Sequence, residues 1–304
     1  MAAPNRYRFL DPRAVARTKN LGLTARGVVE GWLSGLHASP YHGFSVEFAE
    51  HREYSPGDDP RHLDYRSLAR TDRLFVKQYE DETNMRVQIL LDCSGSMGYR
   101  HSGPMTKLAY AQHIAAVLAY LLTRQQDAVG LSAFDHALRL DIPPGSTPRH
   151  FHEMMRRLEQ IEPGEPTDIA DTLHRMASRL KRRGLIILLS DLYDDREPGR
   201  DDADAVIRAL HHFRHRRHEV ILFHVLDRAE IEFPFDDLTG FTDLETGRRI
   251  EVDPAYAADA YRREFQRFVD RYRRACGEAR VDYIQADTST PHDEFLARCL
   301  RSRR

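Results

Sequence analysis

The segment Asp92-Cys-Ser94-Gly-Ser96-Met places three oxygen-bearing side chains at alternate positions. This spacing suits a tight loop that wraps one side of a hard cation, and its glycine lets the backbone bend close to the ion. Magnesium prefers octahedral oxygen ligands at about 2.0–2.1 Å and keeps several of its waters. The segment therefore predicts one side of a divalent-metal site.

Two later residues are expected to complete this site. Thr167 opens an expected helix, and Asp191 follows the most apolar stretch of the chain, Leu185–Leu189. Ligands of open α/β sheets bind beyond the carboxyl ends of the strands. We therefore expect a site for Mg²⁺ or Mn²⁺ formed by Asp92, Ser94, Ser96, Thr167 and Asp191.

The elements that must position these residues alternate between strands and helices from about Arg86 onward. Short apolar runs predict buried strands at Val87–Leu91, Ala128–Phe134, Leu185–Leu189, Val220–Leu226 and Val281–Gln285, with Ala137–Ile142 as a hairpin partner. Helical spacing of apolar residues predicts helices at Lys107–Thr123, Arg149–Gln160, Thr167–Arg182 (ended by Gly184), Ala203–Phe213, Ala255–Cys276 and Pro291–Leu300. The alternation predicts an α/β fold with a doubly wound, mostly parallel sheet covered on both faces.

The first 85 residues have a different pattern. Ala14–His37 is predicted to be helical, whereas Phe44–Tyr54 and Leu74–Asp81 are expected strands on either side of a turn-rich stretch. We therefore divide the chain into a small N-terminal α+β module, residues 1–85, and a sheet domain, residues 86–304.

The predicted metal ligands resemble a known site. DCSGSM, followed by a PTD segment and an LLSD segment, is similar to the metal-ion-dependent adhesion site of von Willebrand factor A domains. The resemblance makes Asp92, Ser94 and Ser96 the first loop, Thr167 the threonine of the second loop and Asp191 the aspartate of the third. Glu165 and Pro166 replace glycines that often precede that threonine, which departs from the family pattern.

A second resemblance lies upstream, from Gly43 to Glu82. It is to the bacterial family called domain of unknown function 58, and its hallmarks are Glu47-Phe48, Arg52, Tyr54, Pro56-Gly57-Asp58-Asp59, Arg61, Asp64 and Ala69-Arg70, with Tyr65 in place of the usual tryptophan. The resemblance implies a MoxR-type AAA ATPase as partner, a chaperone-like or assembly role, and no defined enzymatic activity. The arginines and aspartates of this stretch form either an internal ion-pair network or a second recognition surface.

Composition bears on the class of partner and on the cellular location. The net charge of −2 provides no global attraction to nucleic acid or anionic lipid. The three cysteines, Cys93, Cys276 and Cys299, form neither a disulfide framework nor a set with zinc-ligand spacing. The first residues contain no apolar stretch typical of a signal peptide, and no apolar run is long enough to span a bilayer. We expect a cytoplasmic protein.

The sequence is compatible with three functions. The first is a non-enzymatic module that binds an acidic residue of a partner protein through the metal. The second is a metal-dependent phosphohydrolase, which needs a second acid where Ser94 stands. The third is a nucleic-acid-binding or scaffold protein that uses the basic cluster His211–His218, which is otherwise a solvated helix end. The residues favour the first function, without catalysis.

Overall fold

The computed structural model describes residues 7–10, 46–53, 74–81, 85–164, 168–193, 202–244 and 247–301. The chain forms two compact units, one of residues 37–84 and one that combines residues 1–36 with residues 85–304. In the larger unit, Phe9 and Leu10 are buried in the hydrophobic core. The first residues therefore belong with the sheet domain and not, as expected from the sequence, with the N-terminal module.

The larger unit is built on a six-stranded sheet with the order β10-β7-β6-β3-β4-β5. The strands are β3 (Arg86–Asp92), β4 (Ala128–Phe134), β5 (Leu138–Gly145), β6 (Leu185–Ser190), β7 (Glu219–Leu226) and β10 (Asp282–Asp287). All neighbouring strands are parallel except β4 and β5, which form the expected antiparallel hairpin. The predicted α/β fold with a mostly parallel sheet is confirmed.

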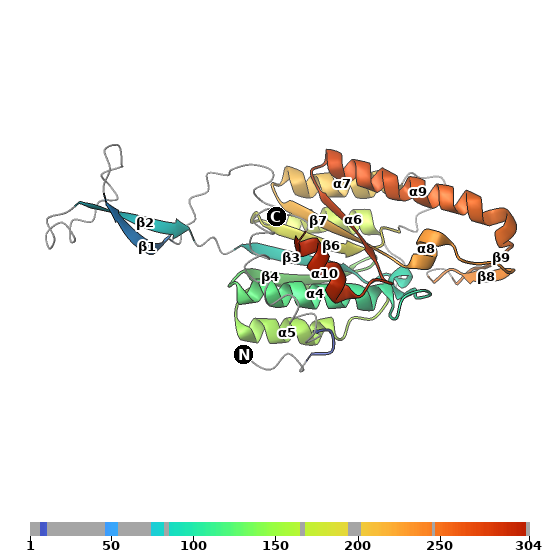
Figure 1. Cartoon of the computed structure of the whole chain (residues 1–304), viewed down its shortest axis with the longest axis horizontal. Coiled ribbons are helices and arrows are strands. Elements are labelled where there is room, and N and C mark those ends of the chain that lie inside the picture. Colours follow the sequence, from blue (N-terminus) through green and yellow to red (C-terminus); the bar gives the residue numbers. More distant parts are fainter. Residues whose placement is uncertain are drawn as a thin grey trace. The chain divides into compact units, whose positions relative to one another are not determined.

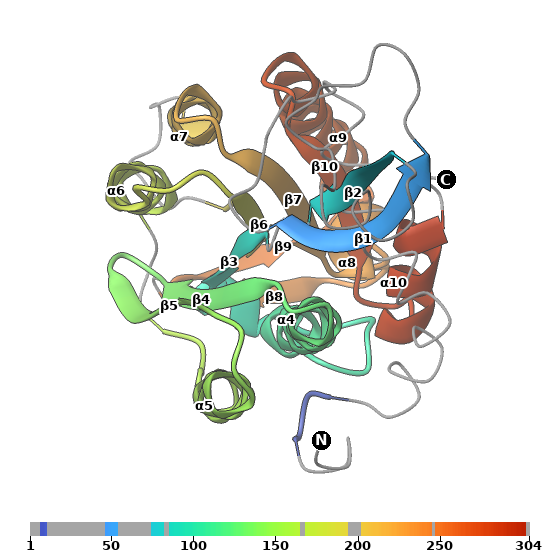
Figure 2. The ribbon, with the colours of Figure 1, turned by 90° about the vertical axis from the view of Figure 1, so that its left-hand side faces the viewer.

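Helices cover both faces of this sheet (Figures 1 and 2). One face carries α4 (Lys107–Arg124), α5 (Pro148–Leu158) and α10 (His292–Arg301); the other carries α6 (Ile169–Arg179), α7 (Asp202–His215) and α9 (Pro254–Glu278). Side chains alternate along β3, so that Ile89 and Leu91 enter the first core whereas Leu90 enters the second. The central strands are buried on both faces, which explains why their sequences are continuously apolar.

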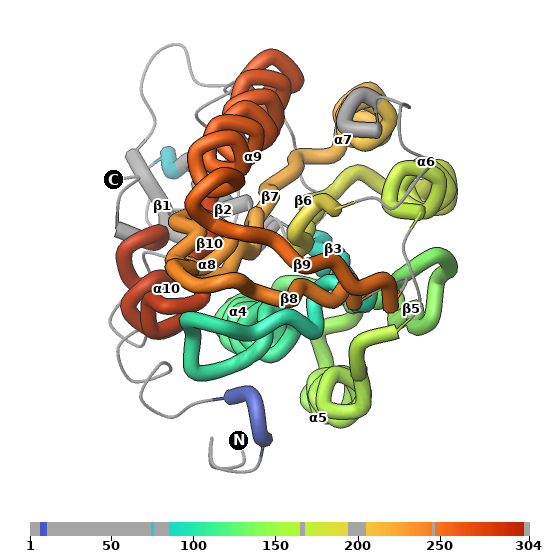
Figure 3. Tube along the Cα trace, turned by 90° about the vertical axis from the view of Figure 1, so that its right-hand side faces the viewer, coloured from blue at the N-terminus to red at the C-terminus, as the bar shows by residue number. Residues whose placement is uncertain are grey.

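Three short elements were not expected from the sequence. They are α8 (Arg228–Glu232) and the antiparallel strands β8 (Thr239–Thr242) and β9 (Arg249–Val252). The hairpin of β8 and β9 lies beyond the carboxyl ends of the central strands, across the end of the sheet (Figure 3). Its base rests on Phe233 and Phe235, whose rings lie 5.7 and 5.0 Å from the ring of Phe241.

The smaller unit contains a two-stranded antiparallel sheet of β1 (Val46–Glu53) and β2 (Phe75–Asp81), with an irregularity between Phe48 and Glu50. Both strands agree with the sequence-based prediction. The predicted helix Ala14–His37 and the family hallmarks between Tyr54 and Arg70 lie outside the described residues.

Two local expectations need correction. Helix α6 ends at Arg179, because Leu180 leaves the helical conformation four residues before Gly184. His218 was grouped with a solvated basic cluster, but it is only 1% exposed and lies under the loop before β6. Helix α7 ends at His215, and the chain then turns inward through Arg217, whose φ is positive.

Candidate metal centre at the carboxyl end of the sheet

The first loop of the predicted site brings three of its residues together. Asp92 ends β3, and Ser96 lies in the short 3-10 helix η3 (Gly95–Gly98). Asp92 Oδ1 accepts a hydrogen bond from the Ser94 backbone N–H at 3.0 Å, and Ser94 Oγ lies 3.1 Å from Ser96 Oγ. Asp92 and Ser94 are fully buried. The loop thus turns two hydroxyls and a carboxylate toward one place.

Asp191 joins this group from the neighbouring strand. It follows β6, which pairs with β3 in register from Val87 to Leu91. Burial and the nearby Asp191 carboxylate raise the pKa of Asp92 well above its ordinary value. Ser190 Oγ donates to Asp92 Oδ2 at 2.6 Å, which fixes the carboxylate from the other side. Four of the five predicted ligands therefore share one end of the sheet.

Thr167 lies outside the described residues, but the chain on both sides of it is placed. Before it, the Gly164 N–H donates to the carbonyl oxygen of Cys93 at 2.7 Å, so this stretch lies against the first loop. After it, Asp168 caps α6 by accepting from the Asp171 N–H at 3.0 Å. The position of the Thr167 side chain stays a prediction.

A buried lysine at this site was not expected from the sequence. Lys107 Nζ lies 2.7 Å from Asp191 Oδ2 and 2.7 Å from Glu230 Oε1, and its side chain is 1% exposed. Burial alone lowers the pKa of Lys107, but Asp191 and Glu230 raise it above its ordinary value, so the ammonium stays charged. A cation in the first turn of a helix opposes the helix dipole, and this conflict was the signal in the sequence.

A buried histidine, His224, contacts the backbone of Asp191. His224 Nε2 lies 2.9 Å from the Asp191 carbonyl oxygen, and its Nδ1 lies 2.6 Å from the Tyr283 hydroxyl. Burial lowers the pKa of His224 to about 4, so the ring is neutral at pH 7 and donates one hydrogen bond while accepting the other. The backbone that carries Asp191 is thereby fixed without an additional charge.

Asp227 at the end of β7 holds the segment that follows the first loop. Its carboxylate accepts from the backbone N–H groups of His101 and Ser102 at 3.0 Å and from Ala229 at 2.9 Å. It also caps α8 together with Glu230, whose Oε2 accepts from the Asp227 N–H at 2.7 Å. Through Glu230 and Lys107, the start of α8 is connected to the candidate site.

Cys93 lies in the chain between two of the predicted ligands, Asp92 and Ser94. It is buried, and its Sγ lies 3.2 Å from the carbonyl oxygen of Phe134. Burial, with a smaller contribution from Asp92, raises the pKa of Cys93 to about 12. The thiol therefore stays protonated and serves packing, as expected for a small residue facing away from the loop.

The donor set fits a hard divalent cation. Oxygen ligands on adjacent corners of an octahedron with bonds of about 2.0–2.1 Å lie roughly 2.9 Å apart, close to the Ser94–Ser96 separation of 3.1 Å. Lys107 pairs with Asp191 and Glu230, and the Asp191 carboxylate also raises the pKa of Asp92, so added positive charge beside these carboxyl groups is favourable. Among the described residues, no three His, Cys, Asp or Glu side chains form a cluster that could hold a metal ion.

Comparison with known protein families shows to which family this chain belongs. A model of the family described as protein of unknown function DUF58 matches residues 50–275. This chain belongs to that family. It is 28% identical over 278 residues to uncharacterized proteins of Mycobacterium bovis and Mycobacterium tuberculosis, covering 88% of this chain and 83% of each relative.

Two Bacteroides proteins are among the solved structures that match this chain. One is an aerotolerance-related membrane protein of Bacteroides fragilis, 18% identical with a TM-score of 0.46, which covers 72% of this chain and 99% of that one. The other is BatB of Bacteroides thetaiotaomicron, a conserved hypothetical protein, 15% identical with a TM-score of 0.46, which covers 72% and 98%. Across the described part of this DUF58 chain, no helix combines the length and hydrophobicity needed to cross a bilayer.

Proposed function

We propose that this DUF58 protein is a non-enzymatic binding module whose sheet domain is of the von Willebrand factor A type. In this proposal Asp92, Ser94, Ser96, Thr167 and Asp191 form a metal-ion-dependent adhesion site for Mg²⁺ or Mn²⁺. The observation that carries it is the convergence of the Ser94 and Ser96 hydroxyls with two buried carboxyl groups at one end of the sheet.

The chain's own residues prepare the site for an external acid. Ser94 and Ser96 are neutral donors, and Lys107 neutralises part of the charge of Asp191. A cation held by few charged ligands remains electrophilic and accepts a carboxylate from outside. His224 and Ser190 keep Asp191 and Asp92 in place, so little reorganisation accompanies binding. The partner is therefore expected to present an aspartate or glutamate.

The family resemblance suggests which partner this is. A MoxR-type AAA ATPase, or a substrate presented to one, would supply the acidic residue, and the protein would act in a chaperone-like or assembly role. Catalysis is not part of the proposal, because Ser94 stands where a phosphohydrolase needs a second acid and the Cys93 thiol stays protonated.

Metal binding is tested by thermal melting with and without Mg²⁺. A ligand that binds only the native state raises the melting temperature by mass action. Asp92→Ala is expected to remove most of this rise, whereas Asp259→Ala, which alters an exposed aspartate on α9, is expected to retain it. A rise that survives in Asp92→Ala would place the ion elsewhere.

Partner binding is tested by measuring the affinity for the purified MoxR-type ATPase in magnesium and in chelator. Thr167→Ala is expected to weaken binding with little change in melting temperature, because it removes one neutral ligand at the rim. Affinity that is unchanged by chelator and by Thr167→Ala would disprove the metal bridge. Metal-dependent phosphate-ester hydrolysis that disappears in Asp92→Asn would instead favour the enzyme class.

A further inference from the structure

Exposed apolar side chains gather on one part of the sheet domain, the hairpin of β8 and β9 and the start of α9. They are 70, 52, 50 and 87% exposed at Leu238, Leu244, Ile250 and Tyr256, respectively. The fifth large hydrophobic side chain that is exposed among the described residues, Leu74, belongs to the smaller unit. Single exposed apolar residues are common, but several on one small element indicate an interaction surface. The four residues of the hairpin and α9 form an apolar strip.

The strip follows the hairpin from its base to its tip. Leu238 directly precedes β8, and Leu244 lies in the turn that follows β8. Ile250 lies opposite Phe241 in the register of the two strands, so both side chains are on the inner face of the hairpin. Six residues of extended chain span about 20 Å. The strip therefore matches the length of a short extended segment of another protein.

An aromatic cluster holds the base of the hairpin. The ring of Phe241 packs on those of Phe233 and Phe235. Phe233 in turn lies 4.6 Å from the ring of Tyr261 in α9, and Phe235 lies 5.0 Å from the ring of His101. Because the base is fixed on the sheet domain, little of the free energy of binding is needed to order it.

The same cluster is connected to the candidate metal centre. The backbone N–H of His101 donates to Asp227 Oδ2 at 3.0 Å, at the end of β7. The Tyr261 hydroxyl donates to the Glu230 carbonyl oxygen at 3.1 Å, and Glu230 Oε1 lies 2.7 Å from Lys107 Nζ. Figure 3 shows the hairpin crossing the end of the sheet at which β3 and β6 end. A partner that contacts this end of the sheet is therefore close to the strip.

The polar residues around the strip are mostly acidic. Among the described residues from 236 to 253, the exposed charged side chains are Asp236, Asp237, Asp243, Arg248, Arg249, Glu251 and Asp253. A Cβ atom on Gly240 would lie 2.9 Å from Arg249 Nη2, so this guanidinium lies on the outer face of the hairpin, away from Ile250. Charge complementarity therefore favours lysine or arginine on the partner.

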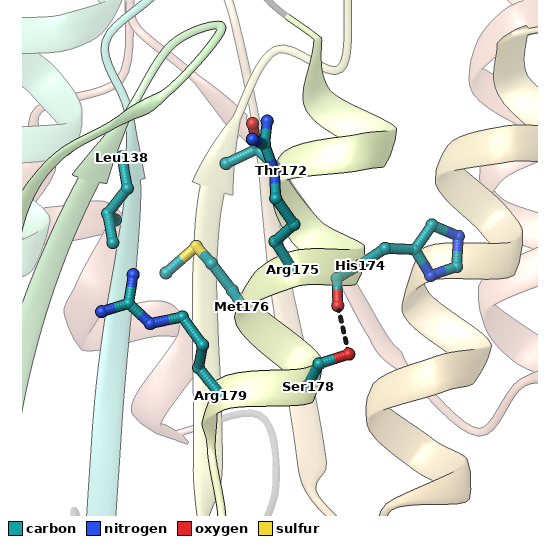
Figure 4. A pocket seen from close by; sticks show the side chains of 7 residues that line it. All are labelled: Leu138, Thr172, His174, Arg175, Met176, Ser178 and Arg179. Atoms are coloured by element: carbon teal, nitrogen blue, oxygen red, sulfur yellow. Dashed lines mark hydrogen bonds between the residues drawn. The ribbon is translucent and has the colours of Figure 1, made fainter.

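Apolar side chains beside α6 are, by contrast, covered by the chain itself. A cavity of about 410 Å³ is lined by Leu138 and Met176 among others. Met176 is buried, Leu138 is half-buried, and Figure 4 shows Arg175 and Arg179 extending on the same side of α6. The methylene groups of arginine cover apolar surface in this way. Within the part of the chain that the structure describes, the apolar strip has no comparable cover, since each of its residues is at least 50% exposed.

We propose that the apolar strip binds a segment of a partner protein in which apolar side chains are flanked by lysine or arginine. The apolar side chains of this segment pack along Leu238, Ile250 and Leu244, and its basic groups meet Asp236 and Asp237. The proposal rests on the function proposed above only in that the same partner also supplies the acid for the metal ion. The strip itself is formed by the chain without a metal.

The probe is a library of random peptides of about twelve residues, about twice the length of the strip, displayed on phage and selected on the full chain in chelator. We expect enrichment of sequences in which apolar residues lie next to lysine or arginine. An enriched peptide, labelled with a fluorophore, is then titrated with the full chain and followed by fluorescence polarisation. Leu238→Ser/Ile250→Ser is expected to weaken its binding about tenfold or more, because apolar contacts at the centre of the interface are lost. Leu74→Ser, which changes the exposed leucine of the smaller unit, is the matched control and should bind as the parent does.

A second variant tests the charge of the surface separately from its apolar contacts. Asp236→Asn/Asp237→Asn is expected to weaken binding about threefold and to reduce its dependence on salt, because two exposed charges are removed. Both positions are exposed, so the melting temperature should stay close to that of the parent. Asp259→Asn/Glu264→Gln changes two exposed acids of α9 and serves as the control.

The outcomes separate this proposal from the metal bridge. Asp92→Ala should bind the peptide as the parent does, so a failure of the metal bridge leaves peptide binding intact. Absence of enrichment, enrichment of acidic peptides, or equal affinity in Leu238→Ser/Ile250→Ser would overturn the strip as a binding surface, whatever magnesium does to the melting temperature.

Two further measurements distinguish the other occupants of the strip. A dimer of the parent that becomes a monomer in Leu238→Ser/Ile250→Ser, measured by sedimentation, would assign the strip to a second copy of this chain. A large fall in the melting temperature of the same variant would assign it to another part of the same chain. Either result would overturn the proposal.

Discussion

The two ends of the central sheet differ in the sign of their charge and in how that charge is held. At the carboxyl end, Asp92, Asp191 and Asp227 are fully buried and bonded to Ser190, Lys107 and backbone N–H groups. At the amino end, Arg179, Lys181 and Arg182 are exposed at the end of α6 and in the loop that precedes β6. Helix N-termini point to the carboxyl ends of parallel strands and helix C-termini to the amino ends, which favours this arrangement of sign.

Buried and exposed charges contribute differently to the stability of the fold. Buried charge at the carboxyl end must be paired in the folded chain, so each group there fixes the geometry of another. Exposed charge at the amino end is screened by solvent and contributes little to folding. Substitutions at the two ends should therefore have different effects on stability.

The largest effect is expected for Lys107→Met. This change leaves Asp191 and Glu230 buried beside each other without the ammonium that lies 2.7 Å from both. The free energy of unfolding should fall by about 3–5 kcal/mol. Urea unfolding followed by circular dichroism measures it, and the exposed Lys181→Met is the matched control. Equal losses in the two variants would show that the two ends do not differ in this way.

The second-largest loss of stability is expected for Gly130→Ala. This change affects the amino end of the sheet through packing rather than through charge. The added Cβ would overlap the Gln88 amide and approach Ile142 O to 2.6 Å. Overpacking of this kind is expected to cost about 2 kcal/mol in the free energy of unfolding. Gly277→Ala in α9 is the control, because a Cβ there meets nothing within 4 Å and the helix gains from alanine. If both variants are equally stable, the packing around Gln88 and Gly130 tolerates an added methyl group.

Asp227→Asn is expected to cost about 1–2 kcal/mol, because one carboxylate oxygen that accepts backbone hydrogen bonds is replaced by an amide donor. Burial by itself raises the pKa of Asp227, but hydrogen bonds from His101 and Ala229 hold it below its ordinary value of 3.8. The stabilisation is therefore present above that value and is lost as the pH falls through the lower pKa of the folded state.

The pH dependence of Asp227→Asn gives a second measurement. Urea unfolding at about pH 6 and about pH 3 should show a smaller stability difference between parent and variant at the lower pH. Asp259→Asn, at an exposed position of α9, should show no such convergence. A difference that is constant across this range would mean that Asp227 acts through shape alone.

The smallest effect on folding is expected for Lys181→Gln/Arg182→Gln. Both residues are exposed in the loop before β6, so the melting temperature should change by an amount equivalent to about 0.5 kcal/mol or less. Thermal melting followed by circular dichroism measures this. A loss as large as that of Lys107→Met would show that these exposed charges contribute to folding as much as the buried ones do.

Much of the fold could be predicted because its signals are local. Apolar runs of strand length placed β3, β4, β6, β7 and β10 within one or two residues of their positions. The hairpin of β8 and β9 was not predicted, because Thr239–Thr242 and Arg249–Val252 are short and largely exposed, and so lack a buried face that would pattern their sequence. The early end of α6 was also missed, since Gly184 gave a stronger stop signal than Leu180.

Local patterns in the sequence were sufficient to identify the DUF58 family and the order of the longer strands and helices, and they placed Asp92 and Asp191 at the ends of buried strands. They contain no information on which side chains surround these two carboxylates. Lys107 reaches Asp191 across 84 positions of the chain, and Glu230 reaches Lys107 across 123. No local pattern encodes these contacts, because a buried ion pair depends on which side chains the folded sheet and helices bring within hydrogen-bonding distance.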